Sequence, residues 1–140
     1  MSSLNLGVTP AIDYAGDITP QLAYQWCQSG EAVLVDVRSD AEREWVGFVP
    51  GALAIAWKQW PGMAINPEFD ERIQNASPDS KKLLLLCRSG VRSIAAAQRA
   101  TALGLEAYNI LEGFEGNPDT LGHRGTLGGW RFHGLPWKQN

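Results

Sequence analysis

The amino-acid sequence predicts an α/β fold in which a central, mostly parallel sheet of five strands carries helices on both faces. Short apolar runs rich in β-branched residues or leucine alternate along the chain with segments that carry helix-start signals. Alternation at this spacing is typical of a parallel sheet covered on both faces. Ligands of such folds bind at the carboxyl ends of the strands, so functional residues are expected there.

The composition is that of a globular protein. Of the 140 residues, 44% are hydrophobic and 19% are charged, and six tryptophans argue against a disordered chain. A chain of this length buries about two-thirds of its unfolded surface, which suffices for one domain. The formal net charge of -3 offers no basic surface for nucleic acid or an anionic membrane. Without a secretory signal or an apolar run of transmembrane length, a cytoplasmic protein is expected.

The strands are predicted from apolar runs and the helices from capping residues. The expected strands are 33–37 (VLVDV), 82–86 (KLLLL) and 107–111 (AYNIL), with a weaker signal at 52–56 and a possible fifth strand at 11–14. Helix starts are expected at Thr19-Pro20, at Ser39 with Glu42 in capping-box spacing, and at Asn66-Pro67, and helix ends at Gly30 and Gly104. Residues 91–103 (VRSIAAAQRATAL) are expected to form an alanine-rich helix.

The last part of the chain, from residue 113, is glycine-rich and irregular. Its Trp130, Phe132 and Trp137 predict that it packs on the rest of the protein instead of being disordered. We therefore expect a single domain over residues 1–140, with a core at about 19–116 and a docked tail at 117–140.

Few residues of this chain can bind metal or form disulfides. Cys27 and Cys87 form no CxxC pair and no zinc-like cluster, so neither a disulfide scaffold, a metal site nor a cofactor is expected. Cys27 lies in the first expected helix and is most simply a core residue, with redox pairing to Cys87 as the alternative. His123 and His133 are expected to have surface or docking roles.

The stretch LLLLCRSGVRS, residues 83–93, carries the strongest functional signal. Cys87 ends an expected inner strand, and a short loop leads from it into the alanine-rich helix. The N–H groups of such a loop and the positive end of the helix dipole form a cradle for an anion. Arg88 and Arg92 add positive charge, so Cys87 is expected to be a thiolate at neutral pH.

The remaining loop residues suit the same cradle. Gly90 permits the positive φ that so tight a loop commonly needs, and Ser89 and Ser93 can donate hydroxyl hydrogen bonds. The alternative is that Cys87 is only a small core hydrophobe, as most cysteines after an apolar strand are. The charged, glycine-containing loop favours a functional thiol.

This loop resembles the active-site loop of rhodanese-family sulfurtransferases, in which a cysteine opens a six-residue loop ahead of a helix. The resemblance covers about residues 19–116, because VLVDVRSDAEREWVGFVPGALAIAW resembles the family's strand-and-turn signature and NILEGFEG its next strand and glycine turn. The GW and GLPW of the tail are similar to endings of some small bacterial members. Phe48 stands where the family usually has histidine, and Glu42 and Glu44 compete for one family position.

The resemblance implies a thiosulfate sulfurtransferase in which Cys87 is the nucleophile. It implies that the loop residues bind substrate, namely Arg88, Ser89, Gly90, Val91, Arg92 and Ser93. Cys87 would take sulfur from thiosulfate, release sulfite, and pass the sulfur from a persulfide to a thiol or cyanide. Arg92 suits either the dianionic donor or an ion pair with Asp36. Arg38 is expected to hold the acidic helix through Glu42 or Glu44.

Other functions remain open from the sequence. A cysteine-dependent phosphatase has a similar loop, but with five residues between cysteine and arginine, whereas four separate Cys87 from Arg92. A non-catalytic module that senses sulfur or binds partners is the other alternative. A monomer or a homodimer is expected, with Trp130 and Trp137 as a candidate dimer contact. Trp57 and Trp60 are candidates for a pocket wall.

Overall fold

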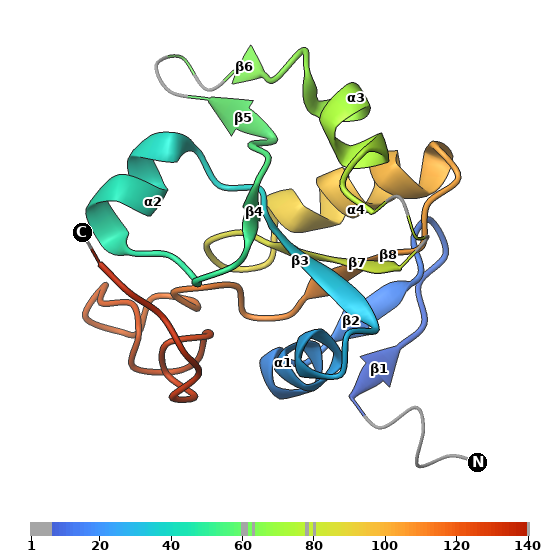
Figure 1. Ribbon diagram of the computed structural model, residues 1–140. Coiled ribbons are helices and arrows are strands. Elements are labelled where there is room, and N and C mark those ends of the chain that lie inside the picture. The colour runs from blue at the N-terminus through green and yellow to red at the C-terminus, as the bar shows by residue number, and fades with distance from the viewer. Residues whose placement is uncertain (1–6, 60–61, 63, 78, 80, 140) are drawn as a thin grey trace.

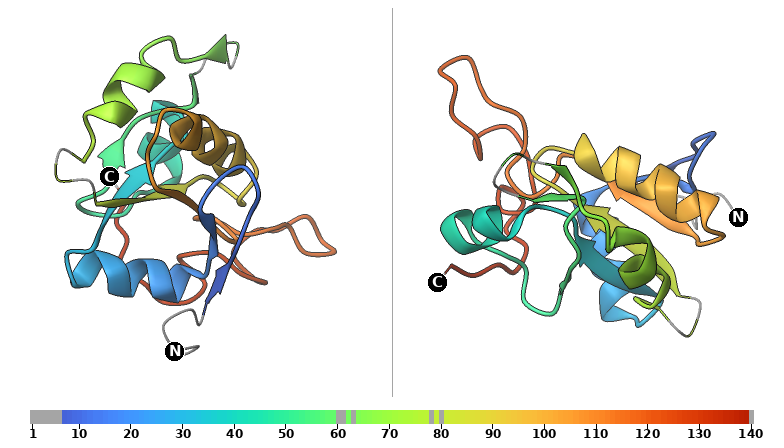
Figure 2. Two further views of the ribbon diagram at one scale, coloured as in Figure 1. Left: turned by 90° about the vertical axis from the view of Figure 1, so that its right-hand side faces the viewer. Right: turned by 90° about the horizontal axis from the view of Figure 1, so that it is seen from above.

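The computed structural model describes residues 7–59, 62, 64–77, 79 and 81–139. Over these residues the chain forms a central sheet with helices packed on both of its faces (Figures 1 and 2). The predicted α/β class and mostly parallel sheet are confirmed. Among the described helices, none has the length and apolar character required to cross a membrane.

The central sheet has six strands in the order β1-β2-β8-β7-β3-β4. They are β1 (Val8–Thr9), β2 (Gly16–Ile18), β3 (Ala32–Asp36), β4 (Leu53–Ala54), β7 (Lys82–Leu86) and β8 (Ala107–Ile110). Five neighbouring strands run parallel to one another, namely β2, β8, β7, β3 and β4. The remaining strand, β1, pairs antiparallel with β2 at the edge. This edge strand makes the sheet one strand larger than predicted. A separate antiparallel pair joins β5 (Lys58–Gln59) to β6 (Ala64–Ile65).

The prediction of a strand at residues 11–14 is wrong. That segment forms bends, and the strand that pairs with β8 is β2, with Gly16 beside Tyr108 and Asp17 beside Asn109. Glycine and aspartate have low strand propensity, so β2 gave no apolar pattern to detect. Pairing with β8 holds it in the sheet. The other expected strands are confirmed to within a residue or two, although β4 is shorter than its signal.

The helices are α1 (Pro20–Gln28), α2 (Asp40–Val46), α3 (Phe69–Gln74) and α4 (Arg92–Ala102). In Figure 2, α3 and α4 cover one face of the sheet, while α1 and the tail cover the other. Side chains of β7 alternate between the two cores: Leu83, Leu85 and then Cys87 belong to the α3/α4 side. Leu84 and Leu86 belong to the side of α1 and the tail.

Most of the predicted caps are confirmed. Thr19 Oγ1 accepts from Leu22 N at 3.2 Å, and Ser39 with Glu42 forms a complete capping box. Gly30 and Gly104 follow α1 and α4 with φ of +81° and +91°. The start predicted at Asn66-Pro67 is displaced, since Asn66 Oδ1 accepts from Glu68 N at 3.0 Å in the turn before α3, and α3 itself begins at Phe69.

The tail packs on the domain, as its aromatic residues predicted. Trp130 is 1% exposed, contacts Tyr24 edge-to-face, and donates from Nε1 to Pro136 O at 2.8 Å. The backbones of Phe48 and Lys138 exchange two hydrogen bonds of 2.8 and 2.9 Å. Because Trp130 is buried within one chain, it cannot form the dimer contact considered from the sequence.

Candidate active site

Cys87 lies directly after the carboxyl end of β7, where the fold predicts a ligand site. Its side chain belongs to the apolar core beneath α4 and is 1% exposed, yet it forms part of the floor of a cavity of about 350 Å³. The other lining residues are Arg88, Ser89, Val91, Arg92 and Arg124. A thiol in this position is shielded from bulk water and open to a small ligand.

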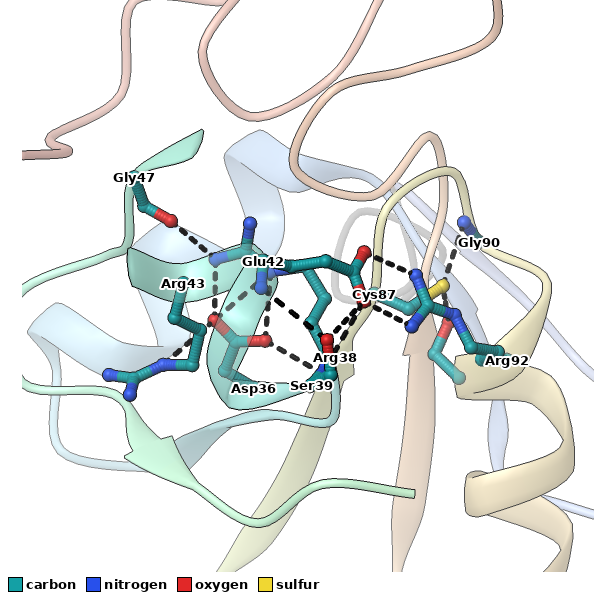
Figure 3. A network of polar contacts seen from close by, with 10 residues as sticks. Asp36, Arg38, Ser39, Glu42, Arg43, Gly47, Cys87, Gly90 and Arg92 are labelled. Atoms are coloured by element: carbon teal, nitrogen blue, oxygen red, sulfur yellow. Dashed lines mark hydrogen bonds and ion pairs between the residues drawn. The ribbon is translucent and has the colours of Figure 1, made fainter. Parts of the chain in front are cut away.

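The loop from Cys87 to α4 turns back over the sulfur. Gly90 has φ of +96°, as predicted, and its N–H donates to Cys87 Sγ at 3.1 Å (Figure 3). The helix α4 begins two residues later at Arg92, so the positive end of its dipole lies at the same loop. Both features place positive partial charge beside the sulfur.

A chain of hydrogen bonds leads away from the sulfur through residues that do not line the cavity. Ser93 Oγ lies 3.2 Å from Cys87 Sγ and donates to Asn109 Oδ1 at 2.5 Å. Asn109 Nδ2 donates to Asp17 Oδ1 at 2.8 Å, and Tyr14 donates to the same oxygen. Because Ser93 has a single hydroxyl proton, it can give that proton either to Asn109 or to the sulfur. Ser93 is therefore a buried partner of the thiol that does not line the cavity.

Arg92 forms an internal ion pair instead of facing the cavity as a free cation. Its NH1 and NH2 contact the two carboxylate oxygens of Glu42 at 2.5 and 2.6 Å (Figure 3). Burial alone would raise the pKa of Glu42, but the hydrogen bonds and charge of Arg92, aided by Ser39, lower it to about 2. The hydrogen bonds to Glu42 in turn raise the pKa of Arg92. The ion pair suggested by the sequence exists, but its carboxylate is Glu42 and not Asp36.

Arg38 has a structural role, with a different partner from the one predicted. The fully buried guanidinium binds the Asp36 carboxylate through Nε and NH2, the shortest contact being 2.7 Å, and donates to Gly47 O at 2.7 Å. It also stacks over the ring of Phe114 at 4.2 Å. Arg38 thus joins the end of β3 to the end of α2 and to the tail side of the core, and the carboxylate that it binds is that of Asp36.

The segment after β8 donates backbone hydrogen bonds to the Cys87 loop. Phe114 N donates to Cys87 O at 2.8 Å, and Glu115 N and Gly116 N donate to Arg88 O at 2.9 and 3.2 Å. A side chain at Gly113 would place its Cβ 2.5–2.6 Å from the backbone of Cys87 and Arg88, which explains the glycine there. This close packing fixes the loop that carries the thiol.

Arg124 is the lining residue that sequence reasoning missed. It comes from the irregular tail, 37 positions after Cys87 in the printed sequence, and its NH1 donates to Gly116 O at 2.6 Å. No local pattern distinguishes it from other arginines of the tail. Only the docking of residues 117–134 brings it to the cavity.

Comparison with known proteins agrees with this geometry. A family model described as the rhodanese-like domain matches residues 19–116. The chain belongs to this family. The boundaries of the match coincide with those of the resemblance noted in the sequence, and they include β3, β4, β7, β8 and the Cys87 loop.

This rhodanese-like protein is similar to a bacterial relative called uncharacterized and to several solved structures. An uncharacterized protein of Rickettsia conorii is 33% identical over 112 residues, which cover 76% of this chain and 83% of the relative. The crystal structure of Rv0390 from M. tuberculosis is 42% identical, with a TM-score of 0.82 and coverage of 91% of this chain and 99% of that one. A protein of unknown function from Rhodopseudomonas palustris, described as a possible tyrosine phosphatase, is 26% identical with a TM-score of 0.56, covering 86% and 82%.

Two other candidate residues, Cys27 and Trp57, do not line the cavity of the rhodanese-like domain. Cys27 packs on the α1 side of the sheet, opposite the core that holds Cys87, and burial raises its pKa to about 11. This placement argues against a Cys27–Cys87 disulfide. Trp57 packs edge-to-face on Phe69 and does not line the cavity, and Trp60 lies outside the described residues.

The two histidines of the tail also lie apart from the thiol. His123 is exposed and its N–H and C=O take part in the turn closed by Asp119, while His133 Nε2 contacts Glu112 at 2.8 Å. Within the described part of the chain, no three His, Cys, Asp or Glu side chains gather as a metal site would require.

Proposed function

We propose that the protein is a thiosulfate sulfurtransferase that carries the transferred sulfur as a persulfide on Cys87. The observation that carries the proposal is the position of Cys87 Sγ, at the floor of a cavity lined by arginines and 3.1 Å from the N–H of Gly90. Membership of the rhodanese-like family supports the same chemistry.

The first half-reaction charges the enzyme with sulfur. The Cys87 thiolate attacks the outer sulfur of thiosulfate, a new S–S bond forms, and the bond between the two thiosulfate sulfurs breaks. Its electron pair leaves with sulfite. The terminal sulfur of the persulfide then carries the negative charge, and preorganised N–H donors of the loop stabilise it as they would an oxyanion.

The second half-reaction regenerates the thiolate. A thiol, as its thiolate, or cyanide attacks the terminal sulfur, the S–S bond to Cys87 breaks, and its electron pair returns to Sγ. We favour a cellular thiol as the natural acceptor over cyanide. No cofactor, nucleic acid or membrane enters this reaction, and two unpaired cysteines suit the reducing cytoplasm. The protein is proposed to act on small molecules as a monomer or homodimer.

Each loop residue has a part in this proposal. Gly90 and Ser93 contact the sulfur directly, and Arg88, Ser89 and Val91 face the cavity where the donor binds. Arg92 also lines the cavity, but its pairing with Glu42 makes it chiefly the tie between the loop and α2.

Phosphate hydrolysis is the second candidate, because the Rhodopseudomonas palustris neighbour is described as a possible tyrosine phosphatase. Two features favour sulfur transfer. Four residues separate Cys87 from Arg92, which makes a ring of N–H groups smaller than phosphatase loops provide. In addition, both terminal nitrogens of Arg92 already bind Glu42, so its fork is occupied before any phosphate arrives.

Parallel turnover assays separate these functions. Thiosulfate and cyanide are expected to yield thiocyanate with the wild-type protein and not with Cys87→Ser, while an aryl phosphate stays intact with both. Hydrolysis of the aryl phosphate that requires Cys87, without thiocyanate formation, would favour the phosphatase. A persulfide that no thiol or cyanide removes would favour the sulfur-sensing module.

A further inference from the structure

The cavity above Cys87 contains three arginines, but their charges are not equivalent. The guanidinium of Arg92 is neutralised by Glu42. Neither Arg88 nor Arg124 has a carboxylate partner among the residues that the structure describes, and the contact recorded for Arg124 is to a neutral carbonyl, Gly116 O. The uncompensated positive charge that a ligand meets therefore comes from Arg88 on the loop and Arg124 on the tail.

The tail holds Arg124 in a defined position. Asp119 organises the turn that precedes it, because Oδ1 accepts from the N–H groups of Leu121 and His123 and Oδ2 accepts from Thr126 Oγ1 at 2.7 Å. The side chain of Arg124 is also held, because its NH1 donates to Gly116 O. The cation is thus presented by a closed turn and not by a free chain end.

One residue connects Arg124 to the thiol loop. Gly116 donates through its N–H to Arg88 O, and its carbonyl accepts from Arg124 NH1. The backbones of Gly116 and Gly129 approach so closely that a side chain on Gly129 would lie 2.7 Å from Gly116 N. The backbone of Arg88 and the guanidinium of Arg124 therefore both hydrogen-bond to the same short, tightly packed backbone segment.

We propose that Arg124 is a specificity-determining residue, which with Arg88 selects sulfur donors that carry anionic oxygens and holds those oxygens while the outer sulfur faces Cys87. This inference rests on the proposed sulfurtransferase function. Two cations over one thiol suit a dianionic donor such as thiosulfate, whose oxygens can accept charge-assisted hydrogen bonds from guanidinium groups. The same contacts support the departing sulfite, because the charge stays on those oxygens as the S–S bond breaks.

Alkylation of Cys87 by two reagents of nearly equal size tests this selection without turnover. Iodoacetate carries a carboxylate and iodoacetamide is neutral, so the ratio of their rates at Cys87 reports the charge felt in the cavity. Arg124→Gln is expected to lower this ratio by roughly three- to ten-fold, with little change in the iodoacetamide rate. Arg124→Lys should retain most of the ratio, because it keeps the charge.

The matched control is Arg72→Gln, since Arg72 is an exposed arginine that also donates to a backbone carbonyl, Ala54 O, but does not line this cavity. In Arg72→Gln, the ratio of the iodoacetate rate to the iodoacetamide rate at Cys87 is expected to equal that of the wild type. Peptide mass spectrometry follows Cys87 separately from Cys27. An unchanged ratio in Arg124→Gln, or an equal fall in Arg72→Gln, overturns the proposal.

Steady-state kinetics then connect the cation to the donor. Arg124→Gln should raise KM for thiosulfate by about ten-fold and change kcat less. A KM equal to that of wild type overturns the role in donor selection even if the alkylation ratio falls. If the ratio falls in a protein that forms no persulfide with thiosulfate, Arg124 selects anions as inferred, and the proposed sulfurtransferase function is the part that fails.

Discussion

Cys27 and Cys87 are the two cysteines of this small protein, and the fold gives them different surroundings. Cys27 lies in the last turn of α1 against an apolar layer, where burial raises its pKa to about 11. Cys87 is the more deeply buried residue, but a backbone N–H and a hydroxyl contact its sulfur and arginines surround the cavity above it. Under the proposed function, burial alone does not make a thiol unreactive. The polar groups supplied by the strand-loop-helix turn decide whether it can act.

The largest expected contrast between the two cysteines is in turnover. Cys87→Ser removes the nucleophile, so thiocyanate formation from thiosulfate and cyanide should fall by on the order of a thousand-fold or more. Cys27→Ser should stay within about two-fold of the wild type, because Cys27 lies across the sheet from the cavity. Equal losses in the two variants would mean that both thiols take part in the reaction.

The next contrast concerns the reactivity of the thiols themselves. At pH 7, iodoacetamide should label Cys87 at least about a hundred-fold faster than Cys27, because only a trace of Cys27 is ionised while its pKa is about 11. Site-resolved peptide mass spectrometry measures both rates in one sample. Similar rates at the two sites would remove the anion cradle from the account of Cys87.

The Glu42–Arg92 pair offers a test of how the loop is held. Glu42→Gln removes the carboxylate and leaves the half-buried Arg92 unpaired, which should cost about 3 kcal/mol of unfolding free energy at pH 7. The pKa of Glu42 is about 2 in the folded protein, against about 4.5 for an unperturbed glutamate. A lowered pKa contributes stability above pH 4.5 that is lost as the pH falls toward 2.

Urea unfolding across that range measures the effect. The difference between wild type and Glu42→Gln should be largest at neutral pH and shrink between pH 4.5 and 2. Glu44→Gln is the control, since Glu44 lies two positions along the same helix and is not the carboxylate that binds Arg92. A difference that does not depend on pH would show that the charge of Glu42 contributes little.

The smallest expected effect comes from the buried hydrogen-bond chain behind the thiol. Asn109→Leu removes the acceptor of the Ser93 proton, so the hydroxyl is free to donate to the Cys87 sulfur. Labelling of Cys87 near neutral pH should then rise by roughly two- to five-fold, while Ser93→Ala should lower it. A fall in labelling with Asn109→Leu would mean that Asn109 helps the thiolate and does not compete with it.

The distance along the chain between interacting groups explains what could be predicted from the sequence. The loop around Cys87 was predictable, because a strand, a glycine at positive φ and a helix start are all written within ten adjacent residues. The capping box at Ser39 was predictable for the same reason. Each depends on chemistry between near neighbours in the chain.

Groups that meet only through tertiary packing could not be assigned in this way. The partner of Arg92, Glu42, lies 50 positions away in the chain. Arg38 differs, because its partner Asp36 is only two positions away, although an acidic side chain of α2 was expected. Arg124 reaches the cavity only because the tail docks. The strand β2 was missed because its glycine and aspartate are held by β8 and not by local propensity.

The central claim is that Cys87 alone carries the transferred sulfur, and intact-mass spectrometry after treatment with thiosulfate tests it most directly. Wild type and Cys27→Ser are predicted to gain the mass of one sulfur atom and to lose it on addition of cyanide or a thiol. Cys87→Ser is predicted to gain no mass. No gain in the wild-type protein, or the same gain in Cys87→Ser, would contradict the account.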